Sequence, residues 1–520
     1  MFQKSPNLKN KLNPCQLRRR VFVFFISFSL TCLFAGCHSK FKTPQDTLVI
    51  GLEASPLTLD PRKAVDAYSS KVSRLVHSGL FKTSARLEIV PDLVERYELT
   101  PPLVYRFQIR DGVFFSDGKK LSAEDIKYTF ESILDPALAS PFRGTFEKIR
   151  EIKVVDPLTI EISLKEPFAP FLSALTMGIV AIGADPMVGT GPFVVERFMP
   201  SEGVWLRKNE KYYEKVPRIN ALQFRMIPDD NLRILELKNH RIDLLQNNVP
   251  PALLGILKNQ KDLVFEKTEG INESYLGLNL RAGPLQKKEV RQAMAYALDL
   301  RSLINYRMGQ MAKPATGLLA PIHWAYEPTV TTYPYNPKKA RQLLDEAGYP
   351  DPDAQGPDFR FSLTYKTSTK RDRIGLARLV ARYLGDVGID VKILPFEWGT
   401  LFEDLTKGNF ELYSLTWVGI TEPDIYYYAF HSSQRPPVGA NRGGYQNTTI
   451  DRLTEQGQKE EDLPKRKLIY SEVQKILSQE LPMIPLWYED NFAVFSNRVK
   501  GVQLRPDGSF EWVTSVWKEQ

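Results

Sequence analysis

The sequence predicts an α/β protein built from several domains. Over residues 361–415, short apolar runs alternate with amphipathic segments, which is typical of βαβ units. Hydrophobic residues make up 43% of the chain and charged residues 25%, the balance of a folded globular protein. The chain has 520 residues. At ~100–200 residues per domain, this length predicts about three or four domains.

The net charge of +8 does not indicate a nucleic-acid partner. The first 36 residues contain six basic side chains and no acidic one, so the remaining residues carry 63 basic and 61 acidic side chains. A nearly neutral body lacks the basic surface that phosphate binding needs. We therefore expect no nucleic acid among the partners and interpret the charge excess as a targeting feature.

The first 36 residues have the layout of a secretory signal. Arg18, Arg19 and Arg20 end a positive segment, and the 16 residues from Val21 to Gly36 are almost entirely apolar. At ~1.5 Å per residue these positions reach about 24 Å, short of a hydrocarbon core of ~30 Å. No comparable run follows, so we do not expect a multi-span membrane protein.

The apolar stretch ends in Leu33-Phe34-Ala35-Gly36-Cys37, which resembles the lipobox of bacterial lipoproteins. In that family a diacylglyceryl group is attached to the cysteine thiol and the peptide is cleaved just before it. Phe34 departs from the leucine that is usual at its position. The resemblance implies a signal peptide over 1–36, lipidation of Cys37 and a polar tether over 37–45. The alternative is a plain cleaved signal with an incidental cysteine.

Cysteine and histidine usage predicts no metal and no cofactor. Cys15 and Cys32 lie inside the predicted signal, so the exported chain would contain Cys37 alone and no intramolecular disulfide. None of the five histidines has another histidine or a cysteine at ligand spacing. Nickel and zinc prefer imidazole and thiolate ligands. A metal held through a chelator's carboxylates stays open.

Strands and helices are predicted in alternation along the body. Strands are expected where apolar residues alternate or run together, at 47–51, 105–110, 159–164, 189–193 paired through 204–207, 222–227, 275–280, 361–365, 391–394, 410–415 and 484–488. Helices are expected where apolar residues share one face, at 69–80, 125–134, 229–237, 288–300, 336–348, 374–384, 401–405 and 465–477. Ser122 to Asp125 has the form of a capping box, and Asn336-Pro337 caps the fifth helix.

Eight short motifs follow one another along the body of the chain. They are Ser55-Pro-x-x-Leu-Asp-Pro61, Phe107-x-Ile-Arg-Asp-Gly112, Phe115-Ser-Asp-Gly118, Ala123-Glu-Asp-Ile126, Gly189-Thr-Gly-Pro-Phe193, Asn209-x-x-Tyr212-Tyr213, Val290-Arg-Gln-Ala-x-x-x-Ala297-Leu-Asp299, and Asn336-Pro-x-x-Ala340 through Ala347-Gly-Tyr349. Each motif is weak alone, but their order is not plausibly chance. Together they resemble family 5 of the extracellular solute-binding proteins, the peptide/nickel class that delivers ligands to ABC importers.

The resemblance implies an α/β fold that is periplasmic-binding-protein-like, of type II in its large three-domain form. Two lobes would surround a cleft, with an extra α+β domain inserted in the first lobe. Lobe I is expected at 46–90, 188–270 and 488–520, the inserted domain at 91–187 and lobe II at 271–487. The chain looks shortened between Leu175 and Gly189 relative to the family, which leaves that boundary open.

The resemblance implies that the protein binds a solute and catalyses no reaction on it. The protein would be a substrate-binding lipoprotein that encloses a small solute, an oligopeptide in the first instance, and delivers it to an ABC permease and ATPase complex. We expect a monomer in the cell envelope, held to the membrane by its lipid. A sugar or chelated-metal binder and a sensory or scaffold lipoprotein of the same fold remain open. An exported hydrolase is the rival class, although no Gly-x-Ser-x-Gly elbow occurs.

Aromatic side chains are the expected ligand contacts. The resemblance implies cleft positions for Asn247, Trp398, Trp417 with the following Val418 and Gly419, and Tyr488 or its neighbour Trp487. Aromatic rings supply broad contact area at low entropy cost, which suits ligands with varied side chains. The alternative is that these rings fill the core.

Peptide-binding relatives commonly carry, shortly after this tryptophan, an aspartate that pairs with the ligand's amino terminus. Here Ile420 occupies that place. A buried ammonium needs a charge partner. Either Glu422 or Asp424 has taken over, or the ligand lacks that amine, and the alternative makes Glu422-Pro-Asp424 a solvated turn. We expect that the protein does not select an α-amine in the way of those relatives.

Overall fold

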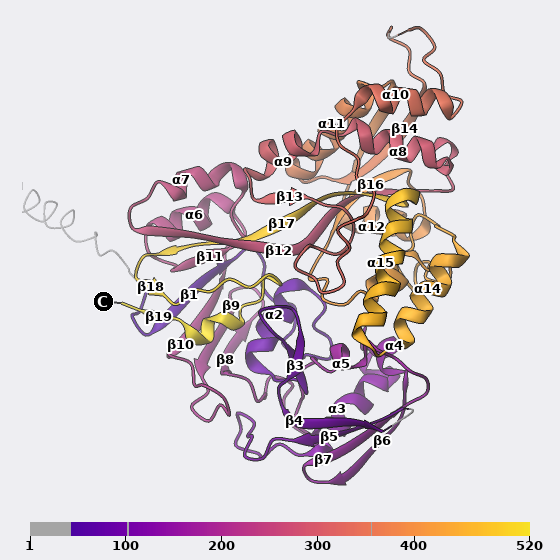
Figure 1. The fold of residues 1–520 in the computed structure, drawn as a ribbon. Helices are drawn as coiled ribbons and strands as arrows, with labels where there is room; N and C mark the ends of the chain where they lie inside the picture. Colours follow the sequence, from indigo (N-terminus) through magenta and orange to yellow (C-terminus); the bar gives the residue numbers. More distant parts are fainter. Residues whose placement is uncertain (1–42, 101–102, 355, 520) are drawn as a thin grey trace, which may run out of the picture.

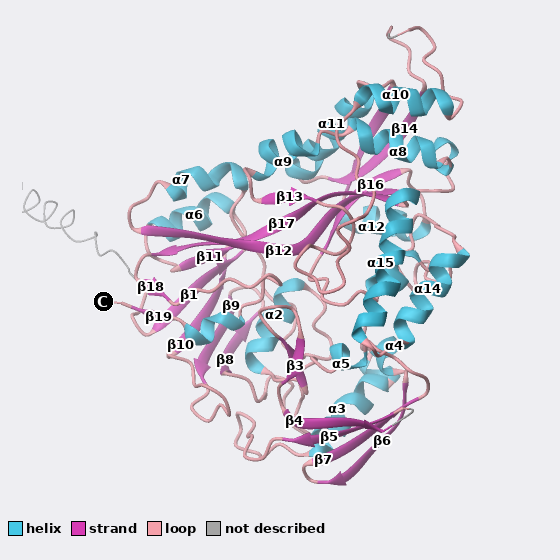
Figure 2. Ribbon diagram, viewed as in Figure 1, coloured by secondary structure: helices cyan, strands magenta, loops and turns pink. Residues whose placement is uncertain are grey.

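The computed structural model of the protein describes residues 43–100, 103–354 and 356–519. Its centre is an 11-stranded sheet in the order β15-β14-β16-β12-β17-β11-β1-β10-β9-β8, with β13 paired to β17. Figures 1 and 2 show this sheet running across the molecule, with β12 and β17 connecting its two ends and helices packed along it. No helix within the described ranges combines the length and hydropathy that crossing a bilayer requires.

The strands have the following bounds: β1 Thr47–Leu52, β2 Phe81–Thr83, β3 Ile89–Pro91, β4 Val94–Thr100, β5 Val104–Ile109, β6 Ile149–Asp156, β7 Thr159–Leu164, β8 Phe193–Met199, β9 Gly203–Lys208, β10 Ala221–Met226, β11 Leu244–Gln246, β12 Leu263–Leu278, β13 Ala312–Pro314, β14 Phe361–Ser368, β15 Ile389–Phe396, β16 Leu412–Trp417, β17 Met483–Ser496, β18 Val499–Lys500 and β19 Trp517–Lys518.

The α-helices have the following bounds: α2 Ala67–Val76, α3 Ala123–Leu134, α4 Arg143–Phe146, α5 Phe171–Ala174, α6 Asp230–Lys238, α7 Leu254–Lys258, α8 Lys288–Ala297, α9 Leu300–Met308, α10 Pro337–Glu346, α11 Arg371–Gly385, α12 Trp398–Lys407, α13 Ile425–Phe430, α14 Thr448–Lys459 and α15 Leu463–Glu480.

The large sheet has two sides, each with its own hydrophobic core. We call β1, the β2–β3 hairpin, β8–β11 and residues 497–519, with helices α2, α6 and α7, the β1 side, and β14–β16 with helices α8–α15 the β14 side. Leu48, Phe224 and Leu206 are fully buried on the β1 side. Leu276, Val380 and Leu412 are fully buried on the β14 side. Separate cores allow each side to behave as a unit.

Strands β12 and β17 connect the two sides. They pair with each other in antiparallel fashion, and the last residues of β12, Glu273–Leu278, also pair with β16 on the β14 side. At the other end, Ala493–Phe495 of β17 pair with β11 on the β1 side. Two long strands therefore form the connection between the halves, and Figure 1 shows them crossing the middle of the molecule.

The pairing of β12 with β17 is interrupted at the crossing, between Thr268 and Asn272. Gly270 lies in this irregularity. A Cβ at Gly270 would lie 2.1 Å from the carbonyl oxygen of Glu489, so a side chain there would force the strands apart. Glycine at this position permits the close approach of two backbones.

A third region, which we call the β4–β7 unit, consists of the sheet β4-β5-β7-β6 and helix α3 packed against it. The predicted capping box at the start of α3 is confirmed, with the Ser122 N–H donating to the Asp125 carboxylate at 3.0 Å. Next to this unit, the Ala169 N–H donates to the Gln458 carbonyl of α14 at 2.7 Å. The Tyr105 hydroxyl of β5 lies 3.2 Å from a Glu461 carboxylate oxygen, so this unit touches the β14 side.

Most predicted elements are confirmed within a few residues, and the exceptions have physical reasons. The helix predicted over 288–300 is two helices, because Leu298 is extended and Asp299 caps α9. Residues 189–192 are a loop before β8 rather than a strand. The strands predicted at 275–280 and 484–488 are ends of β12 and β17, whose remaining residues carry many polar side chains and lack a clean apolar alternation.

Candidate functional site

The crossing strands place Glu273 between two residues of the predicted ligand site. Glu273 on β12 lies opposite Trp417 on β16 and opposite Tyr488 on β17. Directly opposite residues of neighbouring strands point to the same face of a sheet, so these three side chains share one face of the sheet, which we call the Glu273 face. Tyr275 follows on that face, and its ring stacks on Trp417 with centroids 5.9 Å apart. Of the predicted residues, Trp417 and Tyr488 are therefore brought together.

Three buried polar groups near this face lack hydrogen-bond partners among the described residues. They are both carboxylate oxygens of Glu273, the indole Nε1 of Trp417 and the hydroxyl of Tyr426. Glu273 is 0% exposed. An unsatisfied buried polar group costs about 1–3 kcal/mol, and proteins contain few of them. The Glu273 carboxyl, the Trp417 indole N–H and the Tyr426 hydroxyl are therefore available to form hydrogen bonds with a polar ligand.

The electrostatics of this face favour a neutral carboxyl. Burial raises the pKa of Glu273 well above its ordinary value, the nearby Glu489 raises it further, and the Leu486 N–H opposes the shift in part. Burial also raises the pKa of Tyr426, with added contributions from Tyr488 and Glu273. These influences place the Tyr426 hydroxyl near Glu273, and burial favours the protonated form of the Glu273 carboxyl.

Tyr488 borders the Glu273 face, and its hydroxyl is already hydrogen-bonded within the protein. This hydroxyl donates to the Leu319 carbonyl at 2.7 Å and lies 2.9 Å from the Gly317 carbonyl. The Thr316 N–H donates to it at 3.3 Å. These hydrogen bonds hold the loop 316–319 against β17. The ring of Tyr488, rather than its hydroxyl, is therefore the part available to contact a ligand.

The β1 side reaches this place through Leu87, at the tip of the β2–β3 hairpin. Leu87 is 2% exposed and packs in one cluster with Ile271, Ala315, Ala320 and Tyr488. Its φ of +64° lies in the left-handed region, which costs a non-glycine residue roughly 1–2 kcal/mol. Burial of the leucine side chain offsets this cost. The two sides of the molecule thus touch beside the Glu273 face.

Arg505 ties this hairpin to the C-terminal segment. Its guanidinium donates to the Thr83 carbonyl at 2.5 Å and to the Ser84 carbonyl at 3.1 Å. It also pairs with Glu511 at 2.8 Å. The position of Leu87 is therefore supported from the β1 side by contacts outside the hairpin itself.

The backbone after Trp417 lies open. Val418 is 56% exposed, and Gly419 is half-buried with a φ of +66° that favours glycine. The Gly419 N–H donates to Oδ1 of Asn272 at 2.9 Å, which joins this loop to β12. The predicted contact residues Trp417, Val418 and Gly419 are thus contiguous with the Glu273 face.

The predicted acids Glu422 and Asp424 differ in their partners, because Oδ1 of Asp424 is buried without a hydrogen-bond partner among the described residues. Glu422 forms an ion pair with Arg466, whose side chain is 3% exposed. Burial raises the pKa of Glu422, and Arg466 opposes the shift. Burial raises the pKa of Asp424 to about 6, and its contact with Gln458 opposes that shift. The charge of Glu422 is already balanced, and neither acid contacts Glu273.

Asn247 and Trp398 lie away from the Glu273 face. The Asn247 amide donates to Oδ1 of Asn491 at 2.7 Å, and its own Oδ1 accepts from the Phe492 N–H at 2.8 Å. These bonds fasten the end of β11 to β17. Trp398 begins α12, is 56% exposed and contacts Phe402 with ring centroids 5.8 Å apart. A ligand role for these two residues stays a prediction.

Cavities occur at several places. Two of about 30 Å³ border the Glu273 face, one lined by Tyr275 and Trp417 and the other by Thr316 and Tyr426. A cavity of about 510 Å³ lies on the β14 side, beside Asp299 and Tyr335.

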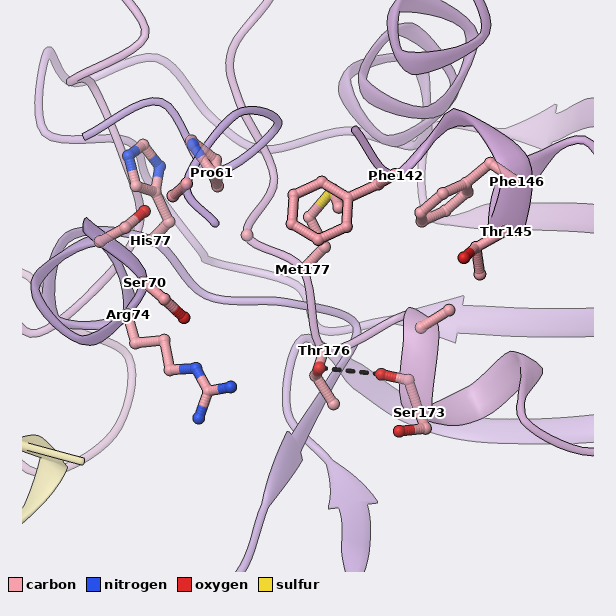
Figure 3. Close-up of a pocket in the computed structure, with 14 residues that line it drawn as sticks. Pro61, Ser70, Arg74, His77, Phe142, Thr145, Phe146, Ser173, Thr176 and Met177 are labelled. Atoms are coloured by element: carbon pink, nitrogen blue, oxygen red, sulfur yellow. Dashed lines mark hydrogen bonds between the residues drawn. The ribbon is translucent and has the colours of Figure 1, made fainter. Parts of the chain in front are cut away.

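A further cavity of about 210 Å³, shown in Figure 3, lies between α2 and helices α4 and α5. Phe142, Met177 and Phe146 supply much of its apolar wall. Its cation, Arg74, lies 3.6 Å from Asp507, so this cavity does not offer an unpaired charge.

The described residues hold no group of three or more His, Cys, Asp or Glu side chains that could bind a metal ion. Burial lowers the pKa of His77 and of His323 to about 4, so both rings are neutral at neutral pH. Cys37, the predicted signal 1–36 and tether residues 37–42 lie outside the described residues.

Sequence reasoning missed Glu273 and Leu87. The strand was predicted to begin at Tyr275, so Glu273 fell just outside it. Carrying the two-residue alternation back from Tyr275 would have placed Glu273 on the same face, where a glutamate is rarely buried without a partner. Leu87 gave no local signal, because its burial depends on residues from the other side of the molecule.

The fold defines a class of protein. It is that of the type II periplasmic binding proteins. NikZ from Campylobacter jejuni, solved with Ni(L-His), superposes with a TM-score of 0.78 at 26% identity, over 92% of this chain and 100% of that one. AppA from Bacillus subtilis, solved with a nonapeptide, gives a TM-score of 0.77 at 25% identity, over 91% of this chain and 99% of that one.

The chain belongs to the bacterial extracellular solute-binding proteins of family 5, because the model of the middle part of that family matches residues 88–437. The glutathione-binding protein GsiB of Escherichia coli O1:K1 is 27% identical over 505 residues, covering 93% of this chain and 96% of the relative. GsiB of Salmonella paratyphi A is 28% identical over 488 residues, covering 89% and 93%. Members of this family are solute-binding proteins that work with ABC importers.

Proposed function

We propose that this protein captures an oligopeptide between its two lobes and delivers it to an ABC permease and ATPase complex. The observation that carries the proposal is the meeting of the two sides beside unsatisfied polar groups: Leu87 of the β1 side packs on Tyr488, the neighbour of Glu273. A site formed by two lobes can close around a ligand and bury most of its surface. The names of the relatives support a peptide, because GsiB binds glutathione, a tripeptide, and AppA was solved with a nonapeptide.

The proposed lobes follow the sequence-derived segments. Lobe I comprises 46–90, 188–270 and 488–520, the inserted domain 91–187, and lobe II 271–487. The separate cores on the β1 and β14 sides support this division. Closure would be a rotation about β12 and β17 at the irregularity containing Gly270. Trp417, Val418, Gly419, Tyr488, Asn247, Trp398, Glu422 and Asp424 are the proposed contact residues.

Native mass spectrometry of the protein purified from its own cell extract tests the ligand class. We expect a set of bound masses separated by amino-acid residue masses. A single bound species with a metal isotope pattern, or a single mass that is not a peptide, would contradict the peptide assignment. Loss of oligopeptide uptake after deletion of the gene would support import, and unchanged uptake would contradict it.

We further propose that the protein is a monomer anchored by lipid on Cys37. Two acyl chains on one diacylglyceryl group hold a protein stably at a membrane. Anchoring near the transporter raises the effective concentration without new contacts. We expect Cys37→Ser to release the protein from the membrane fraction, while Cys32→Ser, the matched control inside the apolar stretch, leaves it bound. Equal distribution of the two variants would contradict lipidation of Cys37.

A further inference from the structure

Glu273 is an unusual residue in this fold, because nothing in the described chain satisfies it. Both of its carboxylate oxygens lack a hydrogen-bond partner among the described residues, and the side chain is 0% exposed. Glutamates are almost never fully buried unless they are paired. A group kept in this state at a cost to stability is a candidate for a functional role.

The surroundings of Glu273 exclude a protein cation as its partner. The groups that influence its pKa are the Glu489 carboxylate and the Leu486 N–H, and no arginine or lysine is among them. By contrast, Glu422 and Glu489 have partners: Glu422 pairs with Arg466, and Glu489 accepts from the Ser274 hydroxyl at 2.9 Å. Glu273 is therefore the buried glutamate of this region that is open to an external cation.

The walls around Glu273 suit an amine. The rings of Trp417 and Tyr488 flank it on the neighbouring strands, and aromatic faces attract cations. Tyr426, whose hydroxyl lies near Glu273, also lines a cavity of about 30 Å³ together with Thr316, whose N–H donates to the Tyr488 hydroxyl.

We propose that Glu273 binds the protonated amine of the captured solute, with Trp417 and Tyr488 against the cation and the Tyr426 hydroxyl as a further acceptor. This inference rests on the proposed function, because it names the chemistry that the same interlobe site recognises. The ligand class is a solute with a free primary amine, such as a peptide with an unmodified amino terminus. The amine would enter while the lobes are apart, before Leu87 packs on Tyr488.

The proposal predicts a proton balance. In the free protein, burial favours the protonated form of the Glu273 carboxyl. Contact with an ammonium group favours the carboxylate, because an opposite charge within a few ångströms lowers a carboxyl pKa. Binding therefore releases the Glu273 proton to the buffer, about one proton per ligand, while the ammonium group keeps its own protons.

Isothermal titration calorimetry with two peptide libraries tests this inference. The probes are random tri- to pentapeptides with free amino termini and the same peptides after N-acetylation, titrated at pH 7 in buffers of different ionisation enthalpy. For the wild type we expect affinity for the free peptides at least about a hundredfold above that for the acetylated ones, with release of about one proton. For Glu273→Gln we expect the free peptides to bind at least about a hundredfold more weakly, without proton release.

Glu411→Gln is the matched control, since it makes the same change at a glutamate already bonded to Thr364 and outside the groups that influence Glu273. We expect it to bind the free peptides within about threefold of the wild type. Circular dichroism checks that each variant is folded, and the proton release of the wild type tests the inference even where Glu273→Gln does not fold.

The inference and the proposed function fail in distinguishable ways. Tight binding of free peptides that is unchanged by Glu273→Gln, insensitive to acetylation or without proton release would overturn the role of Glu273 and leave peptide capture standing. Absence of binding of both libraries to the wild type would overturn peptide capture, and the amine site with it.

Discussion

Two glutamates close to the Trp417 loop, the half-buried Glu422 and the fully buried Glu273, differ in whether a cation balances their charge. Glu422 forms an ion pair with the buried Arg466, which also donates to the Gly457 carbonyl at 2.8 Å. Glu273 has no such partner within the described residues, and burial holds its proton in place. A paired acid is part of the scaffold, whereas an unpaired one costs stability and is available to a ligand. The difference shows that nearness in sequence to Trp417 does not decide which acid is available.

The largest expected effect comes from breaking the paired glutamate. Arg466→Met would leave Glu422 buried without a cation, and we expect a loss of about 3–5 kcal/mol in the free energy of unfolding. Urea denaturation measures it. The double variant Arg466→Met with Glu422→Gln removes both charges and should recover part of the loss. A loss below about 1 kcal/mol in the single variant would contradict the role given to the pair.

The unpaired Glu273 should make the free energy of unfolding depend on pH. The folded state keeps the Glu273 proton, while the unfolded chain loses it above about pH 4.3, so stability falls as pH rises between that value and the raised folded pKa. The slope is at most about 1.4 kcal/mol per pH unit. We expect urea denaturation of Glu273→Gln to give a shallower slope than the wild type. Identical slopes would show that Glu273 titrates alike in both states.

The position of Glu273 depends on the close approach of β12 to β17. Gly270→Ala would place a Cβ 2.1 Å from the Glu489 carbonyl oxygen, and we expect thermal unfolding to show a loss of about 1–3 kcal/mol. Gly255→Ala in α7 is the matched control, because its Cβ would meet nothing within 4 Å. That change should stabilise the helix by about 0.5–1 kcal/mol. Similar outcomes for the two variants would contradict a steric need for glycine at the crossing.

Asp424 should give the smallest effect of this series. Its folded pKa of about 6 lies above the ordinary value for an aspartate, so wild-type stability falls as pH rises through about 4 to 6 and then levels off. Asp424→Asn removes this dependence, and we expect it to raise stability at pH 7 by about 1–2 kcal/mol. The groups near Asp424 are Gln458, Glu422, Arg466 and Lys148. Urea denaturation at pH 4.5 and 7 measures the difference, and an unchanged pH dependence would contradict the assignment to Asp424.

Much of the fold could be predicted from local patterns. The alternation in Thr159–Leu164 and the capping box from Ser122 to Asp125 specify their elements through neighbouring residues, so both appear as predicted. The length of β12 could not be predicted, since its first ten residues pass from three apolar side chains into charged residues and Gly270 without alternation, and they become a strand by pairing with β17. Pairing partners that lie more than 200 residues apart leave no local periodicity to detect.

The candidate site also contains residues that could be predicted from the sequence and residues that could not. Trp417 and Tyr488 were predicted through their motifs, and the crossing strands place both next to Glu273. Glu422 was a reasonable choice from its place after Trp417, but Arg466 could be recognised as its partner only once α15 packed beside the loop. Local patterns therefore determined the alternating elements and the helix caps, because each depends on residues a few positions apart, whereas the family resemblance supplied the aromatic positions. Tertiary structure alone decided which acid lacks a partner and which leucine touches Tyr488, because burial and charge pairing depend on segments that meet only when the chain is folded.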